Sequence, residues 1–581
     1  MNANWHAHYT RWNECESLDP ELRQQLAAMH TDEKQLADCF SAPIAFGTGG
    51  MRGVMEPGIN RINLYTIRKA SAGLALYLLE TYPDLSVKKV VIAYDSRKHS
   101  QLFAKEAAKV LGQYGITTCI FNQLTPTPLL SFAVRHFCAC AGIVITASHN
   151  PPEYNGYKIY GADGGQITLA TAEQLMEHIV AAGDELEITP ANEPDLYKNG
   201  LLHYIDDSLL HAYLEKVKQL RVHPDLSPAI REQVKIVFSP LHGTTYESIT
   251  RGLDFFGYRQ VTVVEEQAIP DPDFSTVASP NPEEPEAFHI AVTYAKRVNA
   301  DLIMGTDPDG DRLGVLVRNH AEDYVVLTGN QLGALLLHYL LSTKHQKGEL
   351  PANGIVLKTI VTSEMGKAIA ADFGVATEDT LTGFKYIGEK IEAYAKKGTY
   401  VFQFGYEESY GYLIGDFVRD KDAVQTALLL TDMCAYYKSQ QQSLYDAMND
   451  LFNRYGHYAE ELISFTCKGR DGMQQITKAM SSLRNHPPVQ IASQTILAIE
   501  DYAIGIRTDC LTGKKTPLTL PASDTIKFFL PKDSWFCVRP SGTEPKIKIY
   551  VGVKGASQSD SQNWIAILKQ SVLKELGFSS D

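Results

Sequence analysis

Short apolar runs alternate with amphipathic stretches along most of the chain. Apolar runs of this length are typical of buried strands, and the amphipathic stretches between them are typical of helices. Strands that alternate with helices indicate βαβ units and parallel sheets. The predicted strands are Val90–Tyr94, Gly142–Thr146, Val234–Phe238, Asp301–Met304, Leu313–Val317, Ile355–Leu357 and Tyr400–Phe404. The predicted helices include Phe103–Tyr114, Pro285–Arg297 and Asn330–Leu341.

Roughly the last 130 residues lack this regular alternation. Trp535–Val538 and Ile547–Val553 are predicted strands joined by a tight polar loop, and Trp564–Leu576 has the pattern of a helix. We therefore expect a separate α+β domain at the C-terminal end.

The length of the chain, 581 residues, indicates several domains, since one hydrophobic core rarely grows that large. At an ordinary domain size the chain holds about four. Stretches that contain Pro or Asn are candidate boundaries, at Thr189–Gly200, His223–Pro228 and Gly348–Gly354. The expected domains are 1–210, 211–325, 326–450 and 451–581.

Composition places the chain among globular proteins, with 44% hydrophobic and 21% charged residues, and excludes the disordered and fibrous classes. The net charge of −14 disfavours nucleic acid and anionic membrane as partners. An anionic small-molecule substrate must therefore be held by a local group of cations.

Nine scattered cysteines without a CxxC pair indicate reduced thiols in a cytoplasmic protein. The segment Met1–Arg11 is polar and lacks the apolar region of a signal peptide. The longest apolar helical stretch, near Leu332–Leu341, is too short to span a bilayer.

Several predicted strands end in a polar turn. The clearest are Asp95–Arg97, Ser148–Pro151, Leu241–Thr244 and Asp307–Asp311. In open α/β sheets, ligands bind at the carboxyl ends of the strands, so these turns are candidate site segments.

The sharpest motif is the loop Gly305–Arg312, which contains Asp307, Asp309 and Asp311 between two predicted strands. Three carboxylates this close stay ionised together only when a cation or strong donors compensate their repulsion. Carboxylate oxygens suit Mg²⁺ or Ca²⁺. An EF-hand is excluded, because counting from Asp307 its sixth and twelfth positions hold Arg312 and Arg318. Carboxylates with open coordination positions fit Mg²⁺ beside a phosphate; the competing interpretation is a solvated acidic turn.

The second motif is the turn Thr146–Pro152, where Ser148 follows a predicted strand and is a candidate nucleophile. The esterase elbow GxSxG is excluded, because Thr146 and Asn150 occupy its glycine positions. We expect His149, the immediate neighbour, to be poorly placed as a base hydrogen-bonded to the serine. Another group must activate Ser148, or the serine arrives already modified; an ordinary capping turn is the alternative.

A third motif, Arg539–Lys546, brackets serine, glycine and threonine with two cations and predicts an anion cradle for phosphate. No Walker loop GxxxxGK[ST] is present, and an ordinary hairpin loop is the alternative. A fourth, Gly405–Gly411, offers Glu407 and Ser409 as acceptors for vicinal sugar hydroxyls, although a solvated acidic loop is the interpretation that this motif favours when it is taken alone. A dinucleotide GxGxxG at Phe46–Gly53 fails, because an arginine takes the third glycine position.

Taken in order, the Ser148 turn, the Asp307–Asp311 loop, the Glu407–Ser409 loop and the Arg539–Thr543 loop resemble the α-D-phosphohexomutase superfamily across nearly the whole chain. The last two loops look most like the branch that includes bacterial phosphoglucomutases and the phosphoglucomutase/phosphopentomutase relatives. The resemblance implies three α/β domains with mixed or parallel sheets and a C-terminal α+β domain around a central cleft. It implies an isomerase that interconverts glucose 1-phosphate and glucose 6-phosphate through a phosphoserine and glucose 1,6-bisphosphate.

The resemblance also implies roles for particular residues. Ser148 would carry a phosphoryl group, and a phosphoserine oxygen would hold Mg²⁺ together with Asp307, Asp309 and Asp311. Lys158 would be the general base. The residues implied to line the site are Arg52, His149, Arg312, Thr382, Gly383, Lys385 and Lys421. Those implied to bind the sugar hydroxyls are Glu407 and Ser409, and those implied to bind the non-reacting phosphate are Arg539, Ser541, Gly542 and Thr543.

Several alternatives stay open at this point. Within the same superfamily, phosphopentomutase, phosphomannomutase and glucose-1,6-bisphosphate synthase activities remain open. Mutases of dual glucose and mannose specificity typically follow the sugar-loop serine with Gly and His, whereas Tyr410 and Gly411 follow Ser409 here. A metal-dependent phosphatase or serine hydrolase and a catalytically silent sugar-phosphate sensor are the rivals outside the mutases. We expect a monomer or a weak homodimer.

Overall fold

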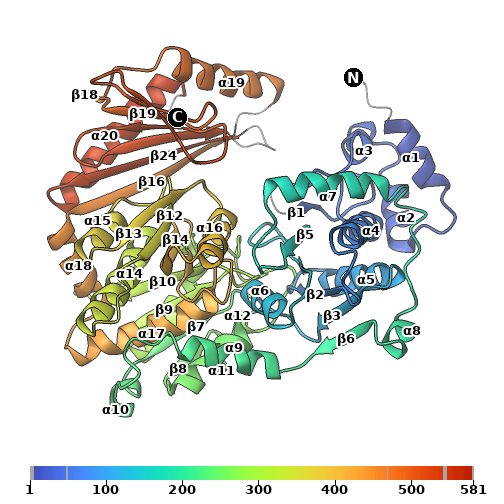
Figure 1. Cartoon of the computed structure of the whole chain (residues 1–581), viewed down its shortest axis with the longest axis horizontal. Helices are drawn as coiled ribbons and strands as arrows, with labels where there is room; N and C mark the ends of the chain where they lie inside the picture. The colour runs from blue at the N-terminus through green and yellow to red at the C-terminus, as the bar shows by residue number, and fades with distance from the viewer. Residues whose placement is uncertain (1–4, 48–49, 467–468, 541–545, 579–581) are drawn as a thin grey trace. The chain divides into compact units, whose positions relative to one another are not determined.

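The computed structural model describes residues 5–47, 50–466, 469–540 and 546–578. By compactness the chain divides into two units. The first unit is Met1–Thr328, Phe384–Gly405 and Ser409–Ser443, and the second is Gly329–Gly383, Tyr406–Glu408 and Leu444–Asp581. Figure 1 shows the elements of each unit with the labels that are used from here on.

The first sheet of the first unit is mixed, with strand order β1-β5-β4-β2-β3-β6. Its central strands are parallel, whereas β5 runs antiparallel to both β4 and β1. The strands are β1 (Gly50–Val54), β2 (Lys89–Tyr94), β3 (Thr117–Phe121), β4 (Ala141–Ile145), β5 (Tyr154–Gly161) and β6 (Leu202–Ile205). The helices are α4 (Leu64–Thr81), α5 (Ser100–Gln113), α6 (Thr127–His136), α7 (Leu169–Ala181) and α8 (Glu193–Lys198).

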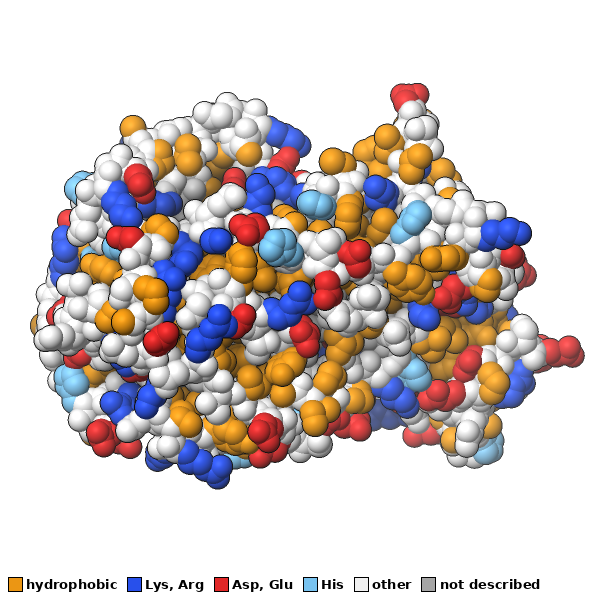
Figure 2. Space-filling view, turned by 90° about the horizontal axis from the view of Figure 1, so that it is seen from below, with side chains coloured by type: hydrophobic (Ala, Val, Ile, Leu, Met, Phe, Trp, Pro, Cys, Tyr) orange, Lys and Arg blue, Asp and Glu red, His pale blue; other side chains and the backbone are white. Residues whose placement is uncertain are grey.

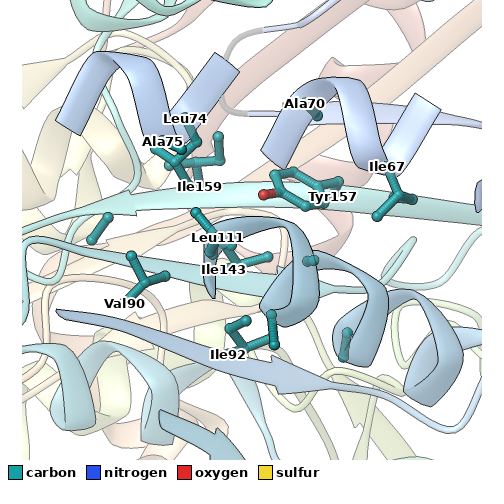
Figure 3. Packing of buried hydrophobic residues seen from close by; sticks show 14 of the residues in the cluster. Ile67, Ala70, Leu74, Ala75, Val90, Ile92, Leu111, Ile143, Tyr157 and Ile159 are labelled. Carbon is teal, nitrogen blue, oxygen red and sulfur yellow. The ribbon is translucent and has the colours of Figure 1, made fainter. Parts of the chain in front are cut away.

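Local sequence explains how this layer forms. Helix α4 begins with a capping box, in which the side chains of Asn63 and Thr66 each accept from the other residue's backbone N–H. Strands β2 and β4 are apolar along their length because helices cover both faces of the parallel region. Figure 3 shows Leu74 of α4 above Ile159 and Ile143 of the sheet. These residues belong to the hydrophobic core between the first sheet and its helices.

The N-terminal helices α1 (Trp5–Glu14), α2 (Pro20–Ala28) and α3 (Glu33–Phe40) form a separate apolar cluster on the first unit. Trp12 lies at its centre and is fully buried. The Trp12 indole N–H donates to Glu185 at 3.1 Å, so this layer is tied to the segment that follows α7. These three helices were not among the elements expected from the sequence.

The second sheet of the first unit has the order β11-β10-β9-β7-β8, with β7 parallel to β8 and β9, and β10 antiparallel to β9. Its strands are β7 (Ile236–Ser239), β8 (Val261–Val263), β9 (Leu302–Thr306), β10 (Leu313–Arg318) and β11 (Tyr324–Leu327). Its helical elements are α9 (Ser208–Lys218), α10 (Pro228–Arg231), α11 (Tyr246–Phe256), α12 (Glu265–Ala268), η1 (Pro285–Phe288) and α13 (His289–Val298).

A third sheet has the order β13-β12-β14-β15. Its strands are β12 (Gly354–Thr359), β13 (Ala376–Thr380), β14 (Val401–Glu407) and β15 (Gly411–Leu413). The helices of this part of the chain are α14 (Gly329–Gln346), α15 (Met365–Asp372), α16 (Phe384–Lys397), α17 (Ala423–Ser439) and α18 (Leu444–Tyr455).

The C-terminal part is an antiparallel sheet in the order β16-β24-β23-β22-β19-β20-β21, together with a short pair β17-β18. Its strands are β16 (His457–Thr466), β17 (Gln490–Ile491), β18 (Gln494–Thr495), β19 (Ala498–Asp501), β20 (Ile506–Asp509), β21 (Lys515–Pro517), β22 (Ile526–Phe529), β23 (Trp535–Pro540) and β24 (Lys546–Gly555). Its helices are α19 (Gly469–Asn485) and α20 (Gln558–Leu576).

Three details expected from the sequence are wrong. Thr189–Gly200 does not separate domains: it contains α8 and leads into β6, which pairs with β3 of the first sheet. Gly348–Gly354 likewise lies within the second unit, in the connection from α14 to β12. The predicted helix Pro285–Arg297 begins with a 3₁₀ turn, and the α-helix starts only at His289. The four domain limits stay a prediction.

Within the described ranges, no helix has both the length and the apolar character needed to cross a membrane. Figure 2 shows acidic and basic side chains interspersed over the face that it presents. A mixed surface of this kind leaves recognition of an anionic substrate to a local group of cations.

Candidate active site

The three aspartates lie on the connection between β9 and β10. These strands pair Thr306 with Leu313, so Asp307–Arg312 forms a tight hairpin loop. Gly310 has φ +69°, and a Cβ there would lie 2.5 Å from the Thr245 side chain, so the turn requires glycine. The backbone N–H groups of Asp311 and Arg312 donate to Asp307 Oδ1 at 3.1 and 3.0 Å. The loop is therefore folded around its first carboxylate.

The structure brings Ser148 to this loop. Ser148 follows β4, is 4% exposed, and its Oγ donates to Asp307 Oδ2 at 3.0 Å. Its φ of +54° is unusual for a residue other than glycine, and such strain persists only where the surroundings enforce it. The Ser148 N–H donates to Thr146 Oγ1 at 2.8 Å, which fixes one side of the serine.

Lysine side chains neutralise part of the aspartate charge. Lys158 on β5 donates to Asp309 Oδ2 at 2.7 Å, and both side chains are buried. Lys421 Nζ lies 3.1 Å from Asp311 Oδ2 and also 3.1 Å from Asp420. Lys158, expected as the general base, is thus the ion-pair partner of one of the three aspartates, which the sequence did not indicate.

The three carboxyl groups differ in their pKa. Burial raises the pKa of Asp307 well above its usual range, and the negative charges of Asp311 and Asp309 raise it further. Burial also acts to raise the pKa of Asp309, but the Lys158 ammonium outweighs it and holds that pKa well below the usual range. The cluster therefore carries more negative charge than its own cations stabilise.

The aspartates fit a divalent cation. One oxygen from each of Asp307, Asp309 and Asp311 lies within 4.8 Å of the others. The Oδ1 atoms of Asp309 and Asp311 are buried and accept no hydrogen bond within the described part of the chain. Buried carboxylate oxygens that accept no hydrogen bond are suitable ligands for a hard cation such as Mg²⁺.

His149 corrects an expectation. Its Nδ1 lies 3.2 Å from Ser148 Oγ, although the sequence suggested that an immediate neighbour is poorly placed. Burial lowers the pKa of His149 well below its usual value, and the cations Arg312 and Arg52 lower it further. The imidazole is therefore neutral and able to share a proton with the serine oxygen.

The remaining predicted residues of the first unit lie as follows. Arg52 on β1 donates to Asn150 Oδ1 at 2.9 Å. Arg312 pairs with Glu283. Lys385 is buried at the start of α16, and Ser409 follows β14.

In the second unit, the Gly383 N–H donates to Glu407 Oε1 at 2.8 Å, with Thr382 beside it in the chain. Arg539 lies near the end of β23, opposite Lys548. Ser541, Gly542 and Thr543 lie outside the described residues.

Sequence reasoning missed three contributors to the Ser148 and aspartate loops. Thr127 donates from its N–H to the Asp309 carbonyl at 2.8 Å, and Thr244 donates to the Pro308 carbonyl at 2.9 Å. The Arg97 guanidinium binds the carbonyls of the Ser148 loop. The polar turns Asp95–Arg97 and Leu241–Thr244 were visible as strand ends, but their targets depend on loop conformation.

Comparison with known proteins covers the same segments. Four family models match, described as Phosphoglucomutase/phosphomannomutase alpha/beta/alpha domains I, II and III and the C-terminal domain. The matched residues are 43–186, 211–320, 328–455 and 511–562. The expected fold, three α/β domains followed by an α+β domain, is confirmed.

Curated relatives agree. A phosphoglucomutase of Staphylococcus epidermidis is 36% identical over 555 residues, which are 95% of this chain and 96% of the relative. A phosphoglucomutase of Staphylococcus aureus is 36% identical over 518 residues, 89% of this chain and 91% of the relative.

A solved structure of a putative phosphomannomutase from Thermus thermophilus has the same fold, with a TM-score of 0.69, 23% identity, and coverage of 92% of this chain and 99% of that one. An open form of the Paramecium phosphoglucomutase parafusin gives a TM-score of 0.68 at 15% identity, over 93% and 97% of the two chains. The chain therefore belongs to the phosphoglucomutase/phosphomannomutase family of the α-D-phosphohexomutase superfamily, whose members are isomerases that relocate a phosphoryl group on a sugar.

Proposed function

We propose that this chain interconverts α-D-glucose 1-phosphate and glucose 6-phosphate, with Ser148 as the carrier of the phosphoryl group and glucose 1,6-bisphosphate as the intermediate. The observation that supports this most is the 3.0 Å contact between Ser148 Oγ and Asp307 Oδ2 inside a buried aspartate cluster. The names of the curated relatives support glucose as the sugar.

In the proposed transfer, the bond between phosphorus and Ser148 Oγ breaks while a bond to the sugar O6 forms. Mg²⁺ held by Asp307, Asp309, Asp311 and a phosphoserine oxygen would neutralise charge on the moving group. The sugar O6 hydroxyl would lose its proton to Lys158 in its unprotonated form, and one proton would be delivered to the departing Ser148 Oγ through His149 Nδ1, which lies 3.2 Å from it. The reverse transfer from the 1-phosphate restores phosphoserine, so no phosphate is lost.

The other predicted residues take the substrate. Glu407 and Ser409 bind the sugar hydroxyls, and Arg539 binds the non-reacting phosphate with Ser541, Gly542 and Thr543. The residues proposed to contact the sugar phosphate elsewhere are Arg52, Arg312, Thr382, Gly383, Lys385 and Lys421. Substitution of Arg539 is expected mainly to raise KM.

The test measures kcat/KM for glucose, mannose and ribose 1-phosphates with the matching bisphosphate present, together with free phosphate. We expect glucose 1-phosphate to be preferred and free phosphate to stay constant. A higher kcat/KM for ribose 1-phosphate indicates a phosphopentomutase, and release of one phosphate per turnover indicates a phosphatase. Ser148→Ala should bind sugar phosphate and lose nearly all turnover; a fully active variant contradicts the proposal.

We also propose a cytoplasmic location and a monomer or weak homodimer. The eight cysteines in the described part of the chain are all free thiols, as in a reducing compartment. Sedimentation analysis over a concentration series tests the oligomeric state.

A further inference from the structure

One buried arginine, Arg97, binds the backbone of the Ser148 loop. Arg97 follows β2 in the turn before α5, and its side chain is fully shielded from solvent. One terminal nitrogen, Nη1, donates to the carbonyls of Pro151 at 2.8 Å and Tyr154 at 3.0 Å. The other, Nη2, donates to the carbonyls of Ser148 at 2.7 Å and Asn150 at 2.5 Å.

These four carbonyls come from a single seven-residue segment, 148–154. Carbonyl oxygens that converge repel one another, so the loop keeps this shape only while a cation with several donors sits among them. Arginine has the planar fork that four acceptors require, whereas lysine is a point charge on a flexible stem. Arg97 is therefore specified as arginine by the loop.

The same contacts reach the reacting atom. The Ser148 carbonyl is bound by Arg97 and its N–H by Thr146 Oγ1, so both sides of the strained serine are fixed. This fixation leaves Oγ directed at Asp307, 3.0 Å away. Release of the carbonyl frees the φ and ψ of Ser148 and moves Oγ relative to the aspartates.

Arg97 is itself held from two sides. Asp95 Oδ1 accepts from the Arg97 N–H at 3.0 Å, and Asp95 Oδ2 lies 3.3 Å from Nε. The ring of Phe274 lies with its centroid 5.0 Å from the guanidinium carbon, and Phe274 is 1% exposed. A buried aromatic face attracts a cation, so this ring fixes the plane of the guanidinium.

Phe274 comes from a different layer of the first unit. Its segment lies between α12 and η1, beside the second sheet. His242, at the end of the β7 turn, contacts the Ile269 carbonyl at 2.9 Å and Thr276 Oγ1 at 2.7 Å, which ties both flanks of this segment to that sheet. The aspartate loop belongs to the same sheet.

We infer that Arg97 and Phe274 are positioning residues, which fix the position of the serine loop of the first sheet relative to the aspartate loop of the second. The inference rests on the proposed function, since Ser148 is the group they position. Neither residue is assigned contact with the sugar phosphate.

The experiment compares Arg97→Lys, Phe274→Leu and Phe274→Tyr with the wild type. Turnover is divided by the fraction of enzyme whose Ser148 accepts a phosphoryl group from glucose 1,6-bisphosphate, measured by intact mass. We expect kcat per competent enzyme to fall about 100-fold in Arg97→Lys and about 10-fold in Phe274→Leu, with KM changed by less than about threefold. Phe274→Tyr keeps the aromatic ring, so its kcat per competent enzyme should stay close to that of the wild type.

A matched control comes from elsewhere in the first unit. Arg221 is also buried, lies over the Phe256 ring at 4.8 Å, and is held by Asp432 at 2.6 Å. Arg221→Lys and Phe256→Leu should lower thermal stability and leave kcat per competent enzyme unchanged. A loss of kcat in these controls equal to that in Arg97→Lys shows a general effect of core damage and overturns the inference.

Amide hydrogen exchange of residues 148–154 is measured on the same proteins, because it does not depend on turnover. We expect exchange to increase at least about tenfold in Arg97→Lys and Phe274→Leu, and not in the controls. Unchanged exchange, or a kcat per competent enzyme within threefold of wild type in Arg97→Lys, overturns the inference. If Arg97→Lys does not fold, the inference is tested with Phe274→Leu alone, by kcat per competent enzyme and by hydrogen exchange of residues 148–154. A wild type that converts no sugar phosphate refutes the proposed function alone, while the exchange result still decides the positioning role.

Discussion

The two units each contain a cluster of buried charges, and the clusters differ in their balance. In the first unit, the three site aspartates, Asp420 and Glu283 lie beside four cations, Lys158, Arg312, Lys421 and Arg52, so carboxylates outnumber cations. In the second unit, Lys358, Lys527 and Lys367 face Glu364, Asp379 and Glu460, so lysines and carboxylates are equal in number.

The balance decides the behaviour of each cluster. Burial opposes ionisation of Glu364, but Lys358 and Lys527 prevail and lower its pKa to about 2. Burial likewise opposes the charge on Lys358, yet Asp379 and Glu364 raise its pKa. Asp307 shows the opposite result, because its pKa is raised by burial and by its own neighbours. Breaking a balanced buried cluster is costly, because it leaves a buried charge without a partner, whereas surplus buried negative charge marks a place suited to a cation.

The largest expected effect is on activity. Asp307→Asn removes one carboxylate ligand and the charged partner of Ser148 Oγ, so kcat/KM should fall about a thousandfold or more. The free energy of unfolding should not decrease, because a neutral amide relieves the repulsion from Asp309 and Asp311. Steady-state assays and denaturant unfolding measure the two quantities.

A control for this substitution is Asp301→Asn, directly before β9, where Asp301 pairs with Lys438 at 2.7 Å. This variant should keep its activity. A variant at Asp307 with more than a tenth of wild-type kcat/KM contradicts the role given to the surplus charge.

The balanced cluster should respond in the opposite way. Glu364→Gln leaves the buried ammonium groups of Lys358 and Lys527 with one carboxylate partner fewer, and the free energy of unfolding should drop by about 3 kcal/mol. The kcat per folded enzyme should stay within twofold of wild type. Denaturant unfolding and an assay of the folded fraction test this, and unchanged stability shows that the cluster does not hold the second unit together.

Metal addition sharpens the comparison. Mg²⁺ at about a hundred times its Kd should stabilise the first unit by about 2.7 kcal/mol, since it binds the folded state only. Hydrogen exchange of the peptide that contains Asp307–Arg312 should slow accordingly, and EDTA should reverse the effect. Peptides around Glu364 should not respond. Equal protection in both clusters, or protection retained in Asp307→Asn, contradicts a specific site.

The smallest effect is a pH dependence in the second unit. Burial raises the pKa of Glu460 to about 7, and Asn330 donates to its Oε2 at 3.1 Å; Ser363, Glu364 and Lys358 also face it. The unfolded chain releases this proton near pH 4.5, so the folded state binds more protons between about pH 4.5 and 7 and stability falls as pH rises through that window.

The change amounts to roughly 1–2 kcal/mol, because the carboxyl is half-buried and keeps part of its hydration. Glu460→Gln should flatten this part of the stability curve. A wild-type curve that rises with pH over the same window contradicts the assignment, and Glu461→Gln, on the neighbouring position of β16, is the control.

Much of the fold was predictable because the signals are local. The apolar runs around Val90 and Ile143 are core strands, and the aspartates of Asp307–Asp311 carry their chemistry in their spacing. The four loops together indicated the family, because each loop contains the residue types that phosphoryl transfer on a sugar needs.

The rest depends on contacts between distant segments. Arg97 could be read only as a polar residue at a strand end, because its four acceptors are backbone carbonyls that no sequence displays. The contact of His149 with Ser148 Oγ depends on a positive φ at a residue that rarely adopts one. Lys158 was expected as a base, but its pairing with Asp309 requires β5 and the β9–β10 loop to meet in space.

The most direct measurement is the intact mass of the enzyme and of its peptide that contains Ser148, before and after incubation with glucose 1,6-bisphosphate. A gain of ~80 Da on Ser148 is expected, the mass of one phosphoryl group, and it should pass to added glucose 1-phosphate without release of inorganic phosphate. An active enzyme that never carries this mass on Ser148, or that carries it on another residue, contradicts the account.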